Sequence, residues 1–274
     1  PPCTNIIFKK GIKRVFFSFN DTDIRTAKKS KEKLNKKKIK IYKKNNNNFK
    51  NFYQSYFLIK KNTIPYIDAK IAASKDYFTI NKNFRWITNL QSRNRVHLMR
   101  SEYDAIISTS KSINKDNSLL NCRLNGFDKN KPDVIIIDLN LKIKKKLNIF
   151  KNIRKRKVFI VSSISNNKKI SYFKKKGIKF ITLKSLNSKN DFINLFKILK
   201  KYGYNRILIE SGLIFLEKLI KNKLIFNLYM FQSSNQLGKN GKNNISNNFI
   251  RKLKLKKRLN VNLNGDKLFK IKIK

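Results

Sequence analysis

The turn Glu210-Ser211-Gly212 follows a short apolar run, Arg206 to Glu210, and precedes a helical pattern from Leu213 to Lys221. A strand that ends in a carboxylate and is joined by small residues to the start of a helix can form an anion-binding turn. Free amides at the start of the helix and the helix dipole both favour negative charge there. The turn has one glycine and lacks the G-x-G-x-x-G pattern of the Rossmann fold. An ordinary strand-to-helix turn explains the spacing equally well.

Three basic side chains are candidates for binding a substrate. Arg100 and Arg123 lie on either side of a strand-like run from Ala105 to Ile113, and two guanidinium groups can clamp a phosphate through paired hydrogen bonds. Lys70 lies within the run Ile67 to Ala73, whose alternate positions are small or apolar. A lysine buried there needs a partner or a ligand. Surface arginines and an exposed lysine are the alternative interpretation.

The chain offers few ligands for a metal. Zinc catalysis needs three protein ligands and an open position for water. The candidates are Cys3, Cys122 and His97, without a His-x-Glu or a Cys-x-x-Cys motif. We interpret Cys3 by itself as a free cysteine and His97 as a structural residue of its helix. Two cysteines cannot build a disulfide framework, which favours a reducing cytoplasm.

Short β-branched runs alternate with helical patterns and would position these side chains. Strands are predicted at Ile12 to Phe19, Ile39 to Tyr42, Pro65 to Ser74, Val134 to Asp138, Val158 to Ser162, Phe180 to Leu183, Arg206 to Glu210, Leu224 to Gln232 and Leu268 to Lys274. Helices are predicted at Asp21 to Leu34, Phe49 to Lys60, Asn89 to Tyr103, Lys168 to Lys176, Asp191 to Tyr202 and Leu213 to Lys221. This order predicts an α/β fold with a largely parallel sheet, a boundary near residue 60 and a loop over 235–248.

The 274 residues include 66 Lys and Arg against 15 Asp and Glu, a net charge of +51. Such a charge is a reason to consider nucleic acid as a partner, because neutralised phosphates release counterions. The lysines, however, run from Lys9 to Lys274 among Asn, Ile and Phe, which share A/T-rich codons. A biased genome therefore explains the composition, and we expect at most non-specific nucleic-acid binding. No apolar run is long enough to predict a transmembrane helix.

Several short motifs occur in order along the chain. They are Pro65-Tyr66-Ile67-x-x-Lys70-x-Ala72-Ala73-Ser74-x-Asp76, Trp86-Ile87-Thr88, Arg100, Asp116-Asn117-x-x-Leu120-x-Cys122-Arg123-Leu124, Ile137-Asp138, Glu210-x-Gly212 and Leu237-Gly238. Together they resemble the reductase half of the bifunctional riboflavin-biosynthesis deaminase/reductase. The resemblance implies a dihydrofolate-reductase-like fold, with a mostly parallel sheet flanked by helices, and an NADPH-dependent reductase domain at 61–274.

The segment before residue 61 resembles the same family. Pro1-Pro2-Cys3-Thr4-Asn5, Gly11-Ile12-Lys13-Arg14-Val15 and Asp21 are similar to the last third of its zinc deaminase domain. The resemblance implies that 1–60 is the C-terminal remnant of a cytidine-deaminase-like α/β domain. Cys3 would then be one of three zinc ligands, but only with an upstream deaminase half that supplies the others. We expect no deaminase activity from this chain alone.

The resemblance also implies an activity and the residues that carry it. The reaction is reduction, with NADPH, of the ribosyl group of 5-amino-6-(5-phosphoribosylamino)uracil to a ribityl group. Lys70 and Glu210 are assigned to catalysis at the reacting sugar. The residues assigned to the substrate are Arg100, Leu120, Arg123 and Glu210. Those assigned to NADPH are Ala72, Trp86, Ser112, Asp116, Gly212, Leu213, Ile214, Phe215, Leu216, Glu217 and Lys218. A cytoplasmic homodimer is also expected.

Departures from the family pattern keep an alternative open. Tyr77 stands where the family usually has glycine, and Phe84 stands where a substrate-contacting serine is common. Ser118 and Leu213 replace prolines. A degenerate, non-catalytic relative is therefore one alternative to a reductase, and the net charge of +51 makes a basic nucleic-acid-binding protein the other.

Overall fold

The protein is described by a computed structural model that covers residues 2–21, 29–44, 47–127, 132–151, 153–165, 167–245 and 257–274. The chain divides into two compact units, Pro1–Thr63 and Ile64–Lys274. This division lies close to the predicted boundary at residue 60. The derivation of the first unit from a cytidine-deaminase-like domain stays a prediction.

The first unit contains α1 (Cys3–Lys9), β1 (Arg14–Phe17), α2 (Lys29–Lys36), β2 (Lys40–Lys43) and α3 (Asn47–Lys61). Strands β1 and β2 correspond to the two strands predicted for this region. They pair in parallel, with Val15 opposite Ile41. Phe16 and Tyr42 stack with their ring centroids 5.1 Å apart and are both exposed. The helix predicted from Asp21 falls partly on residues 22–28, which lie outside the described residues; α2 begins after them.

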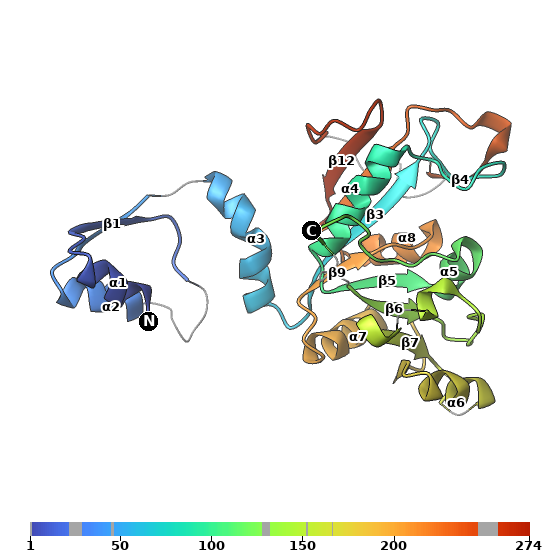
Figure 1. Ribbon diagram of the computed structural model, residues 1–274, viewed down its shortest axis with the longest axis horizontal. Coiled ribbons are helices and arrows are strands. Elements are labelled where there is room, and N and C mark those ends of the chain that lie inside the picture. The colour runs from blue at the N-terminus through green and yellow to red at the C-terminus, as the bar shows by residue number, and fades with distance from the viewer. Residues whose placement is uncertain are drawn as a thin grey trace. The chain divides into compact units, whose positions relative to one another are not determined.

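The second unit is built on an eight-stranded sheet with the order β12-β10-β3-β9-β5-β6-β7-β8 (Figure 1). Its strands are β3 (Tyr66–Ala73), β5 (Ala105–Thr109), β6 (Asp133–Ile137), β7 (Val158–Ser162), β8 (Lys179–Thr182), β9 (Arg206–Ile209), β10 (Asn227–Gln232) and β12 (Lys267–Lys272). Within the described residues every neighbouring pair is parallel except β10 and β12. The predicted mostly parallel sheet is confirmed, and the C-terminal strand closes it as an antiparallel edge.

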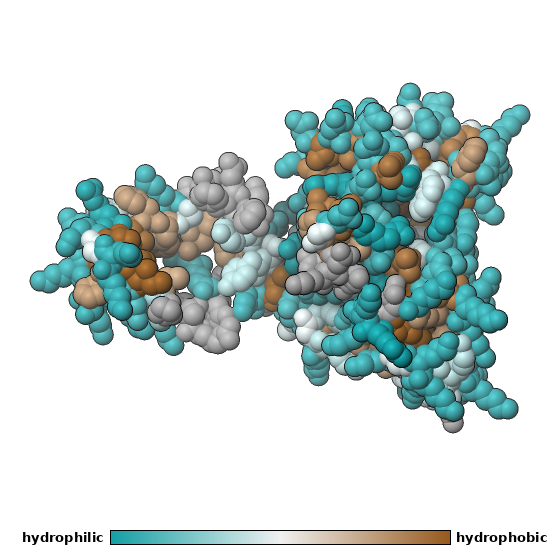
Figure 2. Space-filling view, viewed as in Figure 1, coloured by the Kyte–Doolittle hydropathy of each residue, from teal (hydrophilic) through white to brown (hydrophobic). Residues whose placement is uncertain are grey.

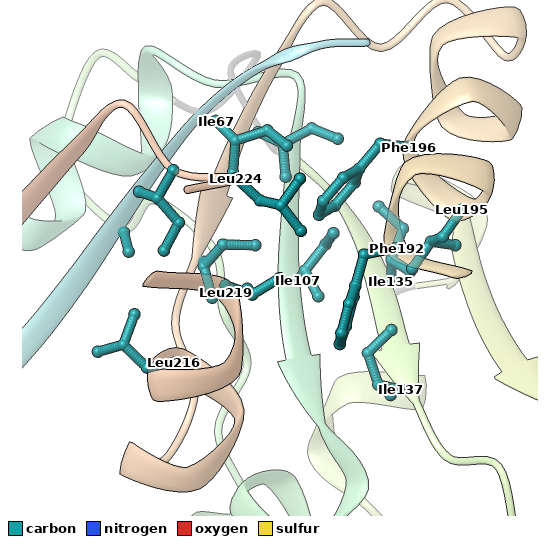
Figure 3. Close-up of a cluster of buried hydrophobic side chains, with 14 of the residues drawn as sticks. Ile67, Ile107, Ile135, Ile137, Phe192, Leu195, Phe196, Leu216, Leu219 and Leu224 are labelled. Atoms are coloured by element: carbon teal, nitrogen blue, oxygen red, sulfur yellow. The ribbon is translucent and has the colours of Figure 1, made fainter. Parts of the chain in front are cut away.

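Helices cover both faces of this sheet. They are α4 (Leu90–Ser101), α5 (Ser110–Asp116), α6 (Lys168–Lys175), α7 (Lys189–Lys201) and α8 (Leu213–Lys221). On one face the buried side chains of α7 and α8, such as Phe192 and Leu216, pack with strand residues such as Ile107 (Figure 3). On the other face α4, α5 and α6 contribute Val96, Ile113 and Phe173 to a second buried cluster. Burial on both faces explains why the central strands read as uninterrupted β-branched runs.

Short 3₁₀ turns lie at Asn148–Phe150, Ile153–Lys155 and Gly238–Asn240. Hydrophilic side chains dominate the visible surface of the second unit, in agreement with lysines spread along the whole chain (Figure 2). The described residues contain no helix with the length and apolarity to cross a lipid bilayer.

Two predictions from the sequence are wrong. The strand-like run 105–113 is strand β5 followed by α5, because the side chain of Thr109 caps the backbone N–H of Ser112 and starts a helix. The predicted loop 235–248 contains a strand, β11 (Gly241–Asn244), which pairs antiparallel with the unpredicted β4 (Phe78–Asn81). Gly241 permits this pairing, because a Cβ at that position would collide with the ring of Phe78.

Candidate active site

The parallel register of β3 and β9 brings Lys70 beside Glu210. Ala69 is paired with Ile209, so the next residue of each chain segment lies at the same level of the sheet. Lys70 Nζ is 3.8 Å from Glu210 Oε2, and the backbone N–H of Glu210 donates to Ile107 O of β5 at 2.9 Å. The two residues predicted to be catalytic therefore face each other across adjacent strands.

Arg100 completes the ionic cluster from α4. Its Nε donates to Glu210 Oε1 at 2.6 Å and its Nη2 donates to Oε2 at 2.9 Å. The side chains of Arg100 and Glu210 are 13% and 8% exposed. A bidentate pair of this kind satisfies both carboxylate oxygens in a site with little water. Asn89 fixes the start of the helix that carries Arg100, because its Oδ1 accepts from Ser92 N at 2.9 Å.

Opposing effects set the protonation of this cluster. Burial raises the pKa of Glu210, but the charge and hydrogen bonds of Arg100 and the charge of Lys70 outweigh it and bring the pKa below its ordinary value. For Lys70, burial and the charge of Arg100 outweigh the attraction of Glu210 and lower the pKa. The carboxylate is therefore held ionised beside an ammonium that releases its proton more readily than a surface lysine.

The loop after α5 adds Arg123 to the same network. His97 Nδ1 lies 2.8 Å from Asn121 O, and Arg123 Nη2 lies 3.1 Å from His97 Nε2. Arg100 Nη1 donates to the same carbonyl of Asn121 at 3.1 Å. The two arginines predicted to clamp a phosphate are thus joined through two residues that were not predicted to lie in the site. Because His97 stands three positions before Arg100 on one helix, their shared face was the signal available in the sequence.

Leu120, predicted to contact the substrate, is buried in the core and bonds through its backbone to Arg156. Its side chain is 5% exposed within the core, and its φ of 48° lies in the left-handed region. Arg156 Nη1 donates to the carbonyl of Leu120 at 2.7 Å, and Arg156 Nη2 donates to that of Leu119. The buried guanidinium therefore fixes the loop conformation that precedes Arg123.

Two residues predicted to bind the cofactor meet where β5 and β9 give way to helices. Gly212 is the N-cap of α8, and a Cβ built on it would lie 3.8 Å from Ser112 Oγ of α5. The first N–H groups of α8 lack partners within the helix, as at every helix start. A glycine beside a hydroxyl and open amides fits a phosphate group of a dinucleotide. Leu213 and Leu216, from the same predicted segment, point into the core, whereas Ile214 is 70% exposed.

Trp86 and Asp116, also predicted to bind the cofactor, are linked by Arg85. The Arg85 guanidinium lies 4.8 Å from the Trp86 ring centroid, and its Nη2 donates to Asp116 O at 2.8 Å. Arg93 lies at the same distance from the ring. Trp86 is half exposed, and both cations lie over its ring. Ala72 of β3 is partly buried in the second core cluster, and Glu217 of α8 forms an ion pair with Lys221 at 2.9 Å.

Asp76 supports the loop that follows β10. It accepts from the backbone N–H groups of Leu237 and Gly238, the latter at 2.8 Å, which joins two of the predicted motifs. Tyr77, next in the chain, has a φ of 68°. The position therefore retains the left-handed conformation that glycine adopts freely, at a cost in strain for tyrosine. A polar cavity of about 580 Å³ lies beside this loop and includes Phe84, which is 73% exposed.

Cys3 does not lie in a metal site among the residues that the structure describes. It is exposed and free, and no group of three His, Cys, Asp or Glu side chains in the described ranges could hold a metal ion. The donor set that zinc needs is therefore not assembled by these residues.

Comparisons with known proteins identify the family. Residues 65–264 match the model of the RibD C-terminal domain. Over 241 residues the chain is 26% identical to the riboflavin biosynthesis protein RibD of Aquifex aeolicus, covering 87% of this chain and 66% of that protein. It is 30% identical over 173 residues to the 5-amino-6-(5-phosphoribosylamino)uracil reductase of Buchnera aphidicola subsp. Acyrthosiphon pisum, covering 59% of this chain and 81% of that protein.

The fold has a close counterpart among solved structures. RibD of Acinetobacter baumannii superposes with a TM-score of 0.80 at 20% identity, over 100% of this chain and 76% of that one. This chain spans 57 to 67% of the length of the first four RibD relatives. The comparisons lend no support to a nucleic-acid-binding protein. From its match over most of the second unit, the chain belongs to the RibD C-terminal domain family.

Proposed function

We propose that this chain is a 5-amino-6-(5-phosphoribosylamino)uracil reductase that uses NADPH to convert the ribosyl group of its substrate to a ribityl group. The observation that carries the proposal is the ionic cluster of Lys70 of β3, Arg100 of α4 and Glu210, which follows β9, in a member of this family. The named reductase of Buchnera, 30% identical over 173 residues, supports the choice of substrate.

The basic side chains suit a phosphorylated substrate. The side chain of Arg123 reaches solvent. Loss of part of its hydration, then the charges of Arg100 and Arg85, lower its pKa. Like charges gathered in one place are stabilised by an anion bound among them. Arg100 is already engaged by Glu210 and Asn121. Arg123 therefore supplies most of the open N–H groups for the 5′-phosphate, and Arg100 supports it through charge.

Lys70 and Glu210 would act on the sugar. The ribose ring must open before C1′ can be reduced, and the ring oxygen then requires a proton. Lys70, whose pKa burial lowers, can donate that proton. Glu210 holds the ammonium in place and accepts hydrogen bonds from ribose hydroxyl groups. Reprotonation of Lys70 from solvent restores the starting state, so one proton is consumed per turnover.

NADPH would lie along the strand ends beside this cluster. Gly212, Ser112 and the first amides of α8 would hold its phosphates, and Trp86, Asp116 and Ala72 would contact the remainder. When bound, the cofactor supplies the hydride. The chain's own contribution is position and charge: two helix starts, a half-exposed tryptophan and a fixed ammonium.

The direct test is turnover. Purified protein, NADPH and the phosphoribosylaminouracil should give the ribitylamino product, with one NADPH consumed per product measured by absorbance and mass spectrometry. NADH should be a poorer substrate. Folded protein that binds NADPH but consumes none would contradict the proposal and favour the degenerate relative.

We also propose that the protein is a homodimer and that it works in the cytoplasm. The cytoplasmic location fits the two free cysteines, Cys3 and Cys122. Light scattering after size exclusion tests the homodimer, since a mass of one chain at micromolar concentration would contradict it.

A further inference from the structure

His97 occupies the middle of the hydrogen-bond chain between the two site arginines. A backbone carbonyl only accepts hydrogen bonds and a guanidinium only donates them. Since Nδ1 faces Asn121 O at 2.8 Å and Nε2 faces Arg123 Nη2 at 3.1 Å, the proton must be on Nδ1 and the lone pair on Nε2. The contacts therefore select one neutral tautomer of the imidazole.

The charged groups around the ring agree with that tautomer. Arg100 on the same helix, Arg123 on the loop and Glu210 at the end of β9 face it. Burial, then the charge of Arg100, lowers the pKa of His97 to about 4. The ring is only 8% exposed. At neutral pH it is therefore uncharged and able to accept from Arg123.

We propose that His97 is a positioning residue that aims the exposed guanidinium of Arg123 at the substrate phosphate. One N–H of Arg123 is fixed by His97 Nε2, and the rest of its donor fork is open to a ligand. Fixing a long side chain before binding removes an entropic cost that a free arginine would incur. Because Asn121 O also accepts from Arg100, the same ring sets the separation of the two guanidinium groups. The identity of the phosphate ligand rests on the proposed function.

A spectroscopic test is independent of activity. His97 is the single histidine of the chain, so one pair of ring nitrogens gives a fully assigned ¹⁵N spectrum. We expect a protonated Nδ1 and an unprotonated Nε2 at pH 7, and a shift of the Nε2 resonance in Arg123→Ala. A protonated Nε2, or an unchanged spectrum in Arg123→Ala, would overturn the proposal.

Kinetics then separate positioning from structural support. His97→Leu removes both contacts and should raise KM for the phosphorylated substrate about tenfold, with KM for NADPH within about twofold. His97→Gln can accept from Arg123 through its oxygen and donate to Asn121 through its amide, so it should restore most of the lost affinity. Asn94→Ala, exposed on the same helix, is the matched control. An equal rise in KM for the phosphorylated substrate and for NADPH would indicate a structural residue. A KM that does not recover in His97→Gln would indicate the same.

A binding measurement keeps this inference separate from the proposed reaction. Ribose 5-phosphate is titrated into the wild type, His97→Leu and His97→Gln by calorimetry. Binding that weakens about tenfold in His97→Leu and recovers in His97→Gln supports the role of His97, even if no reductase activity is found. Equal binding by all three proteins, or no binding by the wild type, would overturn it.

Discussion

Arg100 holds Glu210 through two hydrogen bonds, one to each carboxylate oxygen, at 2.6 and 2.9 Å. Arg100 comes from α4 and Glu210 from the end of β9, so the pair fixes a helix to the end of a central strand. Lys70 approaches the same carboxylate at 3.8 Å. One buried anion thus organises two cations, and its loss would leave them facing each other in a site with little solvent to separate them.

Glu210→Gln should reduce kcat at least about 100-fold while the protein still folds. The amide keeps the shape and one acceptor for Arg100, but the charge that balances Arg100 and Lys70 is lost. The free energy of unfolding should therefore fall by about 3 kcal/mol. Steady-state NADPH oxidation and urea denaturation measure the two effects. Glu102→Gln, exposed at the end of α4, is the control, and a rate in Glu210→Gln within about twofold of wild type would remove Glu210 from catalysis.

Lys70→Met should lower kcat about 100-fold with little change in the free energy of unfolding, because a buried ammonium gives way to an apolar chain of similar length. The exposed Lys197→Met is the control. The pH dependence offers a second measurement. Glu210 raises the pKa of Lys70, so the pH at which Lys70 loses its proton should move lower in Glu210→Gln. A kcat–pH profile with the same alkaline limb in both proteins would contradict this assignment.

The sequence was sufficient for most strands of the large sheet and for its mostly parallel character, whereas the strand order and register come from the structure. Runs such as Val134 to Asp138 are buried on both faces, so their composition identifies them as strands without further context. The pairing of β4 with β11 was not predictable, because the two strands lie far apart in the chain and Gly241–Asn244 is polar without alternation. The decisive contact, Gly241 against Phe78, depends on the fold. The start of α5 was missed because β-branched residues continue to Thr109, where a side-chain cap changes the backbone direction.

The site was only partly predictable. Lys70, Arg100 and Glu210 were named from sequence, and the structure brings them together. Their exact partners depend on contacts far apart in the chain. The carbonyl of Asn121, shared by His97 and Arg100, is a backbone group. Every residue type has this group, so the sequence does not indicate the contact. His97 was interpreted as structural because neither a second histidine nor a cysteine lies near it in sequence.

Gly212→Asp should separate helix stability from cofactor binding. Gly212 has a φ of −69° as the N-cap of α8, a backbone that aspartate adopts easily and a position that it favours. The helix should therefore be as stable or slightly more stable. A carboxylate beside open amides should instead repel phosphates and weaken NADPH binding at least about tenfold. Thermal unfolding and NADPH fluorescence give the two values.

Gly212→Asn is the matched variant for this experiment, since it caps the helix without a charge. It should bind NADPH more tightly than Gly212→Asp does. If both variants bind NADPH as the wild type does, the cofactor phosphates do not lie at the start of α8.

His97 should make the wild type lose stability as the pH is lowered. Its pKa is lowered by folding to about 4, whereas the unfolded side chain titrates near about 6.5. The unfolded state therefore takes up a proton first, so the contribution of the neutral ring is complete above about pH 6.5 and declines towards pH 4. Relative to His97→Gln, the free energy of unfolding of the wild type should fall by up to about 3 kcal/mol over this range. Urea denaturation at several pH values measures the difference, in which Asp68 and the other carboxyl groups shared by both proteins cancel.

Asn94→Ala is the control and should follow the wild type. Parallel curves of unfolding free energy against pH for the wild type and His97→Gln would show that His97 is not held neutral by its two partners.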